Sequence, residues 1–428
     1  MAARDYALFQ LDLHKLPGWP AQELRRPVPQ PKDPRDLALA DRLHIGVVKN
    51  LLWLQHLASY HSNRDLGSID GLVQKILAIG LYQLRFLDRI PARAAIDEAV
   101  EQTRRFGRKS AAGLVNAVLR NATREPDPAD QEVDPAIRLS HPEELVKKLA
   151  KLLDDRDEAI AFCRRDNAEP PTILQLAEGV DVSSVSAPGV AFSLHESGHP
   201  AYVVAGAKHS HFALWSSKNL AHVQDPTAAA VASFMRIERG MSVLDRCAGV
   251  GTKTLQISRL VGPGGKVFAM DPNPDRCALL RSALISRNVN NVGVVEAEWV
   301  KEASHVLPAR FDRVLIDAPC SNSGVLPRRA EARFRQDKAT LKSLIELQRK
   351  VLFDTFDSVA AGGLLIYSTC SIWPEENEIL LERVFTERRD FSVLSSVTTF
   401  PAGDASTPTA YHDGGFVAVM QRFAARRS

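Results

Sequence analysis

The sequence predicts a multidomain protein in which an all-α N-terminal bundle is followed by a small α+β connector and an α/β C-terminal domain. Apolar residues in the first third recur at helical spacing, and a stretch rich in proline and aspartate follows. After residue 221, apolar runs alternate with helical stretches. With 428 residues, 45% of them hydrophobic and 25% charged, the chain is long enough for two or three globular domains.

The N-terminal third reads as a small bundle of amphipathic helices, which we place at residues 1–130. One helical set is Val73, Ile76, Leu77, Gly80, Leu81 and Leu84, and a second set, Ile96, Ala99, Val100 and Thr103, follows a break at Ile90-Pro91. The segment from Glu125 to Pro135 is too polar and too rich in proline to continue a helix. It predicts a linker after the bundle.

Residues 131–218 give mixed signals. A helical piece spans Leu145 to Leu153, Pro170-Pro171 breaks the pattern, and Ala201 to Val204 reads as a short strand. We interpret this stretch as the linker and a small α+β connector.

Residues 219–428 carry the pattern of a parallel sheet covered on both faces. Its expected strands contain Val243-Leu244, Val267 to Met270, Val292 to Val295, Val314 to Ile316 and Leu364 to Tyr367. In such sheets ligands bind beyond the carboxyl ends of the strands. The residues expected there are Asp245 to Lys253, Asp271, Glu298, Asp317 with Cys320, and Cys370.

The loop from Asp245 to Thr254 contains two glycines that allow the backbone to turn sharply and approach a ligand before a helix begins. Asp271, at the end of the next expected strand, adds a carboxylate suited to ribose hydroxyls. Together they favour a nucleoside cofactor, although an ordinary tight turn with an exposed Asp is the alternative. The loop matches neither the phosphate-binding GxxxxGK[ST] motif nor the dinucleotide GxGxxG motif.

The composition excludes several classes of protein. The five cysteines, at positions 163, 247, 277, 320 and 370, are odd in number and lack CxxC spacing, which argues against a disulfide framework and a zinc site. The N-terminus lacks an uninterrupted apolar segment, and no apolar run reaches about 18 residues. The net charge of +3 demands no polyanionic partner, although local basic clusters can bind one. We expect a cytoplasmic monomer without a metal or a membrane anchor.

Two cysteine motifs carry a specific resemblance. Asp317-Ala318-Pro319-Cys320-Ser321 and Ser368-Thr369-Cys370-Ser371, continuing to Asn377, resemble the motifs of the Nop/Sun (RsmB-like) family of RNA cytosine-5 methyltransferases. Upstream, Gly80 to Leu84, Arg89 to Ala95 and Leu114 to Arg120 resemble the NusB-like RNA-binding domain of the bacterial members that modify small-subunit ribosomal RNA. The resemblance therefore implies a NusB-like bundle and a Rossmann-like class I methyltransferase domain.

The resemblance also implies a chemistry. Carbon-5 of cytosine is a poor nucleophile, and addition of a thiolate at carbon-6 activates it. By the family pattern Cys370 is that nucleophile, Cys320 helps to remove the carbon-5 proton, and Asp317 hydrogen-bonds the pyrimidine edge beside the cofactor. S-adenosylmethionine is implied to contact Cys247, Ala248, Gly249, Val250, Gly251, Thr252, Lys253, Asp271 on the ribose side, Glu298 near the adenine, and Asp317.

The target base must be unpaired or extruded from its helix. Arg328, Arg329 and Arg333, closely after Cys320, are candidates for holding the phosphates around it. Arg104, Arg105, Arg108 and Lys109 are either RNA contacts or a solvated helix end.

This sequence departs from the family pattern in five places. Thr172 to Leu176 lacks the expected Arg-Val-Asn, and Asp413 to Phe416 varies the usual Asp-Gly-Phe. Gly249, Val250 and Thr252 replace the second Ala, the Pro and the second Gly of Cys-Ala-Ala-Pro-Gly-Gly-Lys-Thr, and Glu298 stands where Asp is usual. The segment Arg328 to Phe334 keeps the positive charge of the family motif but lacks its usual proline.

The predicted function is methyl transfer from S-adenosylmethionine to carbon-5 of a cytidine in small-subunit (16S) ribosomal RNA. The alternatives are the same reaction on transfer RNA, and a non-catalytic RNA-binding factor for ribosome assembly. Two cysteines within longer motifs favour an enzyme, whereas isolated buried thiols are mostly core filling.

Overall fold

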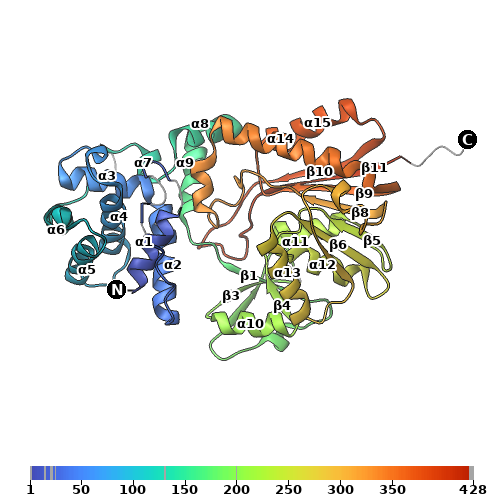
Figure 1. The fold of residues 1–428 in the computed structure, drawn as a ribbon, viewed down its shortest axis with the longest axis horizontal. Helices are drawn as coiled ribbons and strands as arrows, with labels where there is room; N and C mark the ends of the chain where they lie inside the picture. Colours follow the sequence, from blue (N-terminus) through green and yellow to red (C-terminus); the bar gives the residue numbers. More distant parts are fainter. Residues whose placement is uncertain are drawn as a thin grey trace, which may run out of the picture. The chain divides into compact units, whose positions relative to one another are not determined.

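A computed structural model of the chain describes residues 2–13, 16–19, 23–24, 26–129, 132–198 and 200–423. The chain divides into two compact units, whose elements are labelled in Figure 1. Unit 1 comprises Met1–Asn167 and Arg329–Asp337, and unit 2 comprises Ala168–Arg328 and Lys338–Ser428. The short segment Arg329–Asp337 therefore belongs to unit 1, although both of its flanks belong to unit 2.

Unit 1 is built from helices. They are α1 (Ala2–Asp12), α2 (Pro34–Lys49), α3 (Leu51–Ser62), α4 (Gly71–Phe86), α5 (Ala92–Arg105), α6 (Ala112–Arg124), α7 (Pro135–Arg138), α8 (Glu143–Leu153) and α9 (Arg156–Asn167), with 3-10 turns η1 (Leu66–Ser68), η2 (Lys109–Ala111) and η6 (Ala330–Arg335). Helix α4 lies at the centre, since every residue from Leu72 to Gln83 is buried. The two amphipathic sets read from the sequence form α4 and α5, which confirms the helical bundle.

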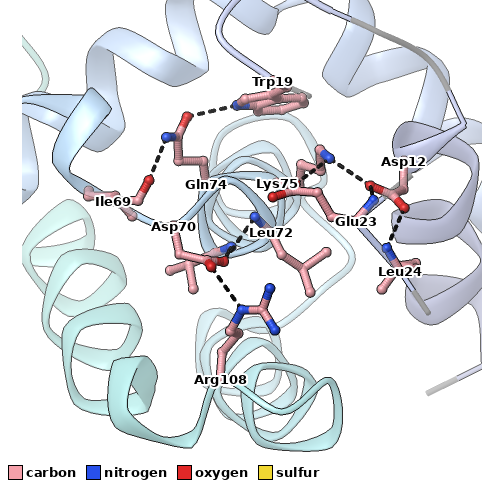
Figure 2. Close-up of polar contacts among 11 residues, drawn as sticks. Asp12, Trp19, Glu23, Leu24, Ile69, Asp70, Leu72, Gln74, Lys75 and Arg108 are labelled. Carbon is pink, nitrogen blue, oxygen red and sulfur yellow. Dashed lines mark hydrogen bonds and ion pairs between the residues drawn. The ribbon is translucent and has the colours of Figure 1, made fainter. Parts of the chain in front are cut away.

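Polar contacts fix the start of α4 (Figure 2). Asp70 caps the helix by accepting hydrogen bonds from two amides of the first turn, and it also accepts one from Arg108 Nε at 2.9 Å. Lys75 is fully buried, and its ammonium lies 2.7 Å from both Asp12 and Glu23. A buried cation needs such partners. The ion pairs therefore tie the chain after α1 to the central helix.

The units do not follow the boundaries drawn from the sequence at 130/131 and 218/219. Helices α7, α8 and α9, expected in the connector, pack in unit 1. Residues 130 and 131, at the predicted boundary, lie outside the described residues. The rest of the expected connector belongs to unit 2.

The first part of unit 2 is a small antiparallel sheet with strand order β2-β3-β1-β4. Its strands are β1 (Thr172–Leu176), β2 (Ala191–Leu194), β3 (Ala201–Ala205) and β4 (Ala221–Val223), with η4 (Val182–Val185) and α10 (His209–Ser217). This is the α+β character that the mixed sequence signals predicted. Asp225 and Pro226 then start α11 (Pro226–Phe234), because the Asp225 side chain accepts the Thr227 amide.

The second part of unit 2 is a seven-stranded sheet of order β10-β11-β9-β8-β5-β6-β7. Strands β5 (Ser242–Asp245), β6 (Lys266–Asp271), β7 (Val292–Glu296), β8 (Phe311–Asp317) and β9 (Val359–Thr369) are parallel. Strand β11 (Gly415–Arg422) is antiparallel to both β9 and β10 (Phe391–Thr399). The connecting helices are α12 (Thr252–Val261), α13 (Pro274–Ser286), α14 (Lys338–Thr355) and α15 (Glu378–Glu387), with η5 (Val300–Ala303), η7 (Phe356–Ser358) and η8 (Pro374–Glu376).

Both faces of this sheet are covered. Successive strand residues point to opposite faces, and on β5 Val243 packs in one core with α11 and α12, whereas Leu244 packs in another with α14 and α15. Figure 1 shows α14 and α15 on the opposite side of the sheet from α11 and α12. The predicted parallel sheet and Rossmann-like fold are confirmed. Among the described helices, none is both long and apolar enough to cross a membrane.

Candidate active site

Three carboxylates end neighbouring strands of the large sheet. Asp245 is the last residue of β5, Asp271 of β6 and Asp317 of β8, as the sequence predicted. Because these strands are parallel and adjacent, their carboxyl ends lie at one edge. Glu298 differs, since β7 ends at Glu296 and Glu298 lies two residues later with an exposed side chain. Its backbone carbonyl accepts a hydrogen bond from Arg246.

The loop between β5 and α12 is shaped by glycine. Gly249 and Gly251 have φ values of 56° and 90°, which side-chain-bearing residues rarely adopt. Asp271 holds this loop, because its Oδ2 accepts the Gly249 amide at 3.0 Å while its Oδ1 accepts the Asn273 amide at 2.9 Å. A Cβ atom built on Gly249 meets nothing within 4 Å, so a ligand can approach the backbone there.

Below the loop, Asp245 is buried at 1% exposure. Its Oδ2 accepts the Thr254 hydroxyl at 2.6 Å, whereas its Oδ1 has no partner among the described residues. Burial raises the pKa of the Asp245 carboxyl to about 7, against the opposing effect of the Thr254 hydrogen bond. Burial likewise raises the pKa of the Cys247 thiol to about 12, so this cysteine is not a thiolate at neutral pH.

Lys253 connects the loop to Asp317. Its Nζ lies 2.7 Å from Asp317 Oδ2, and the Ser368 hydroxyl donates to Asp317 Oδ1 at 2.7 Å. Burial opposes the ammonium form, but the charges of Asp317 and Cys370 outweigh it and raise the pKa of Lys253. Lys253 thus places a permanent positive charge near both the carboxylate and the thiol.

The two motif cysteines meet. Cys320 Sγ and Cys370 Sγ lie 3.2 Å apart, and the Cys370 thiol donates to Asn322 Oδ1 at 3.0 Å. The hydrogen bond with Cys370, followed by burial, raises the pKa of Cys320 well above that of a free thiol. The pair therefore favours one negative charge rather than two. Asn322 belongs to the first motif, but its contact with Cys370, 48 residues away, could not be read from the sequence.

A cavity of about 570 Å³ opens onto Cys370. Cys370, Asp317 and Lys253 line it, together with residues of α11 and the chain leading into β11. Its size is within the range of small-molecule sites. A thiol, a carboxylate and an ammonium group therefore line one cavity.

The three predicted RNA-binding arginines have different environments. Arg329 is exposed. Arg328 is also exposed but is ion-paired within unit 2, because its Nε donates to Asp413 Oδ2 at 2.7 Å and its Nη2 lies 3.7 Å from Asp225 Oδ2. Burial raises the pKa of Asp413 to about 6, with the Asp225 charge adding to the effect.

Arg333 has no exposed surface. Within unit 1 it donates to the carbonyl of Lys49 at 3.0 Å and to Asn167 Oδ1 at 2.9 Å. Burial lowers the pKa of its guanidinium to about 10. The expectation that Arg333 holds RNA phosphates is therefore corrected, because its guanidinium group donates to acceptors inside unit 1. Of the basic cluster around α5, Arg104 pairs with Glu101, Arg105 with Asp5 and Glu98, and Arg108 with Asp70.

Known proteins resemble this chain over most of its length. A family model described as 16S rRNA methyltransferase RsmB/F matches residues 232–419, and the NusB family model matches residues 1–124. The chain is 30% identical over 407 residues to ribosomal RNA small subunit methyltransferase B of Pseudomonas putida, covering 92% of each chain. The chain belongs to the RsmB/F methyltransferase family. A probable ribosomal RNA small subunit methyltransferase B of a Synechocystis strain is 28% identical, again over 92% of both chains.

Solved structures share the fold. The crystal structure of PH0851 superposes with a TM-score of 0.79 and 18% identity over 98% of both chains. NSun6 from Pyrococcus horikoshii with SFG gives a TM-score of 0.52 and 15% identity over 66% of this chain and 98% of that chain.

The RsmB/F family uses S-adenosylmethionine, which is therefore the cofactor of this protein. The residues at the strand ends fit it. The open space beside Gly249 admits a ligand to the loop backbone, and the Asp271 carboxylate beneath it is an acceptor of the kind that ribose hydroxyls require.

Proposed function

We propose that this protein transfers a methyl group from S-adenosylmethionine to carbon-5 of a cytidine in small-subunit ribosomal RNA, with Cys370 as the nucleophile. The observation that carries the proposal is the pair of thiols at 3.2 Å, with Cys370 lining the same cavity as Asp317. Cytosine-5 chemistry needs one group to attack carbon-6 and another to remove the carbon-5 proton. The ribosomal substrate is supported by the relatives from Pseudomonas putida and Synechocystis, which are named as ribosomal RNA small subunit methyltransferases and align over 92% of their length.

Each side chain then has one task. The Cys370 sulfur bonds to carbon-6 as its proton passes to N3 of the base, which makes carbon-5 nucleophilic. Asp317, fixed by Lys253 and Ser368, accepts a hydrogen bond from the N3 and N4 edge of the base. S-adenosylmethionine, when bound, supplies the methyl group.

Release requires a base. After carbon-5 carries the methyl group, the Cys320 thiolate, whose own proton has passed to water, takes the carbon-5 proton and the carbon-5 to carbon-6 double bond re-forms. Cys370 leaves as a thiolate and takes back the proton from N3. A thiol with a raised pKa gives a stronger base once ionised.

We propose which residues would hold the cofactor. Asp271 would bind its ribose, Glu298 would lie near its adenine, and the loop from Cys247 to Lys253 together with Asp317 would contact its methionine end. Arg329 remains the candidate for a phosphate contact because it is exposed, whereas Arg328 is engaged by Asp413. We place this activity in the cytoplasm.

The test is direct. The purified protein is incubated with isotopically labelled S-adenosylmethionine and either small-subunit ribosomal RNA or transfer RNA, and the RNA is digested to nucleosides for mass spectrometry. Labelled 5-methylcytidine from the ribosomal RNA alone is the expected result. Label in transfer RNA alone would overturn the substrate, and label on another position of the base would overturn the chemistry.

A further inference from the structure

A buried carboxylate lies behind the two cysteines. Glu376, the last residue of η8, is fully buried at 0% exposure. Removing a carboxylate from water is strongly unfavourable unless hydrogen bonds replace its hydration. Glu376 is not among the residues that line the cavity, so it does not contact substrate there.

Four hydrogen bonds satisfy this carboxylate. Oε1 accepts the Ser321 amide and Gln348 Nε2, both at 2.9 Å. Oε2 accepts the hydroxyls of Ser321 and Ser371, both at 2.5 Å. Ser321 directly follows Cys320, and Ser371 directly follows Cys370. One carboxylate therefore binds the residue after each thiol.

The arrangement requires a group that only accepts hydrogen bonds. Ser371 Oγ already accepts the Trp373 amide at 3.1 Å and lies 3.0 Å from the Ser323 hydroxyl. If an amide NH₂ replaced Oε2, it would face a hydroxyl oxygen whose lone pairs are in use, and the serine hydrogens would lose their acceptor. In the flipped orientation the NH₂ group would instead face the Ser321 amide and Gln348 Nε2, which are both donors. Glutamine, although the same shape as glutamate, therefore loses hydrogen bonds in either orientation.

We propose that Glu376 is a positioning residue that sets the separation of Cys320 and Cys370 by holding the residue after each of them. The backbones of the two loops also meet where the Gly324 amide donates to the Cys370 carbonyl at 2.9 Å. Glu376 adds hydrogen bonds to Ser321 and Ser371, the residues that directly follow the two cysteines. Its catalytic consequence rests on the proposed function, but the thiol geometry is measurable without RNA or cofactor.

The first experiment measures the thiol pair itself. Phenylarsine oxide forms two As–S bonds with release of water, so tight binding requires two sulfurs that reach one arsenic atom. We expect Glu376→Gln to bind phenylarsine oxide at least tenfold more weakly than the wild type does, with an affinity close to that of Cys320→Ser. Glu382→Gln, an exposed glutamate on α15, is the matched control and should bind as the wild type does. A smaller change in Glu376→Gln would overturn the proposal.

The second experiment measures catalysis. Displacement of reacting groups by about 1 Å lowers rates by roughly 100-fold. Glu376→Gln should therefore reduce kcat by about that factor while its Kd for S-adenosylmethionine stays within twofold of wild type. An unchanged kcat, or a loss confined to cofactor binding, would overturn the positioning role.

A folding defect is handled by a second variant. Ser371→Ala keeps the carboxylate and removes one of its donors, and it should weaken phenylarsine oxide binding in the same direction. If Glu376→Gln unfolds and Ser371→Ala binds as the wild type does, the proposal is overturned. A wild-type protein whose dithiol depends on Glu376 but which methylates no RNA would contradict the proposed function alone.

Discussion

Arg333 is predicted to stabilise unit 1 rather than to bind RNA, and Arg333→Met tests this. Its guanidinium donates to three backbone carbonyls and to Asn167, and the side chain is 0% exposed. Methionine fills much of the same space but leaves these acceptors without donors. Disrupting a buried charged network of this kind costs about 3–5 kcal/mol. At about 2–4 °C per kcal/mol, the melting temperature of unit 1 should fall by roughly 6–20 °C.

Calorimetry and RNA binding measured at several salt concentrations separate the two roles. A lysine or arginine that contacts a phosphate contributes about 0.7–0.9 to the slope of log affinity against log salt. Below the melting temperature Arg333→Met should keep the wild-type slope. Arg329 is exposed, so Arg329→Ala should reduce the slope by about 0.7–0.9 and keep the wild-type melting temperature. A reduced slope in Arg333→Met with unchanged melting would refute the reasoning.

Three further predictions follow from the site. Because the pKa of Asp245 is raised to about 7, the folded state binds more protons than the unfolded state between about pH 4 and 7, and stability falls as pH rises through that range. Asp245→Asn should flatten this dependence by up to about 4 kcal/mol, as chemical denaturation at each pH would measure. Gly324→Ala places a Cβ 2.6 Å from the Gly414 backbone and should cost about 1–3 kcal/mol, whereas Gly113→Ala, with nothing within 4 Å on a helix, should stabilise by up to about 1 kcal/mol. Cys320→Ala should still form the covalent bond to cytidine but release it slowly. Denaturing gels should therefore contain a covalent protein–RNA band even with ordinary RNA that carries no 5-azacytidine, and rapid turnover would contradict the role of Cys320.

The fold and the strand-end residues were predictable because both are local in sequence. Alternating apolar runs locate β5 to β9, and the polar residue after each run follows from chain order. The family motifs then identify Cys320 and Cys370, which the structure brings to 3.2 Å. The end of β7 was misplaced by two residues, since nothing in the run distinguishes Glu296 from Glu298 as the last paired residue.

The arginines could not be assigned from sequence, because a positive charge in a sequence does not reveal what lies opposite it. Arg328 and its partner Asp413 are separated by 85 residues in the sequence, and Arg333 and its partner Asn167 by 166 residues. Glu376 was visible as part of a motif, but its hydrogen bonds come from two loops and from α14. These contacts depend on tertiary packing.

The central claim is that Cys370 attacks carbon-6 of a cytidine. The most direct measurement uses small-subunit ribosomal RNA carrying 5-azacytidine, whose ring accepts the thiol but has no carbon-5 proton to lose, followed by denaturing electrophoresis. With S-adenosylmethionine present, the wild type should give a denaturation-stable protein–RNA band that Cys370→Ala abolishes. A band that persists in Cys370→Ala, or no band from a wild-type protein that binds the RNA, would contradict the mechanism.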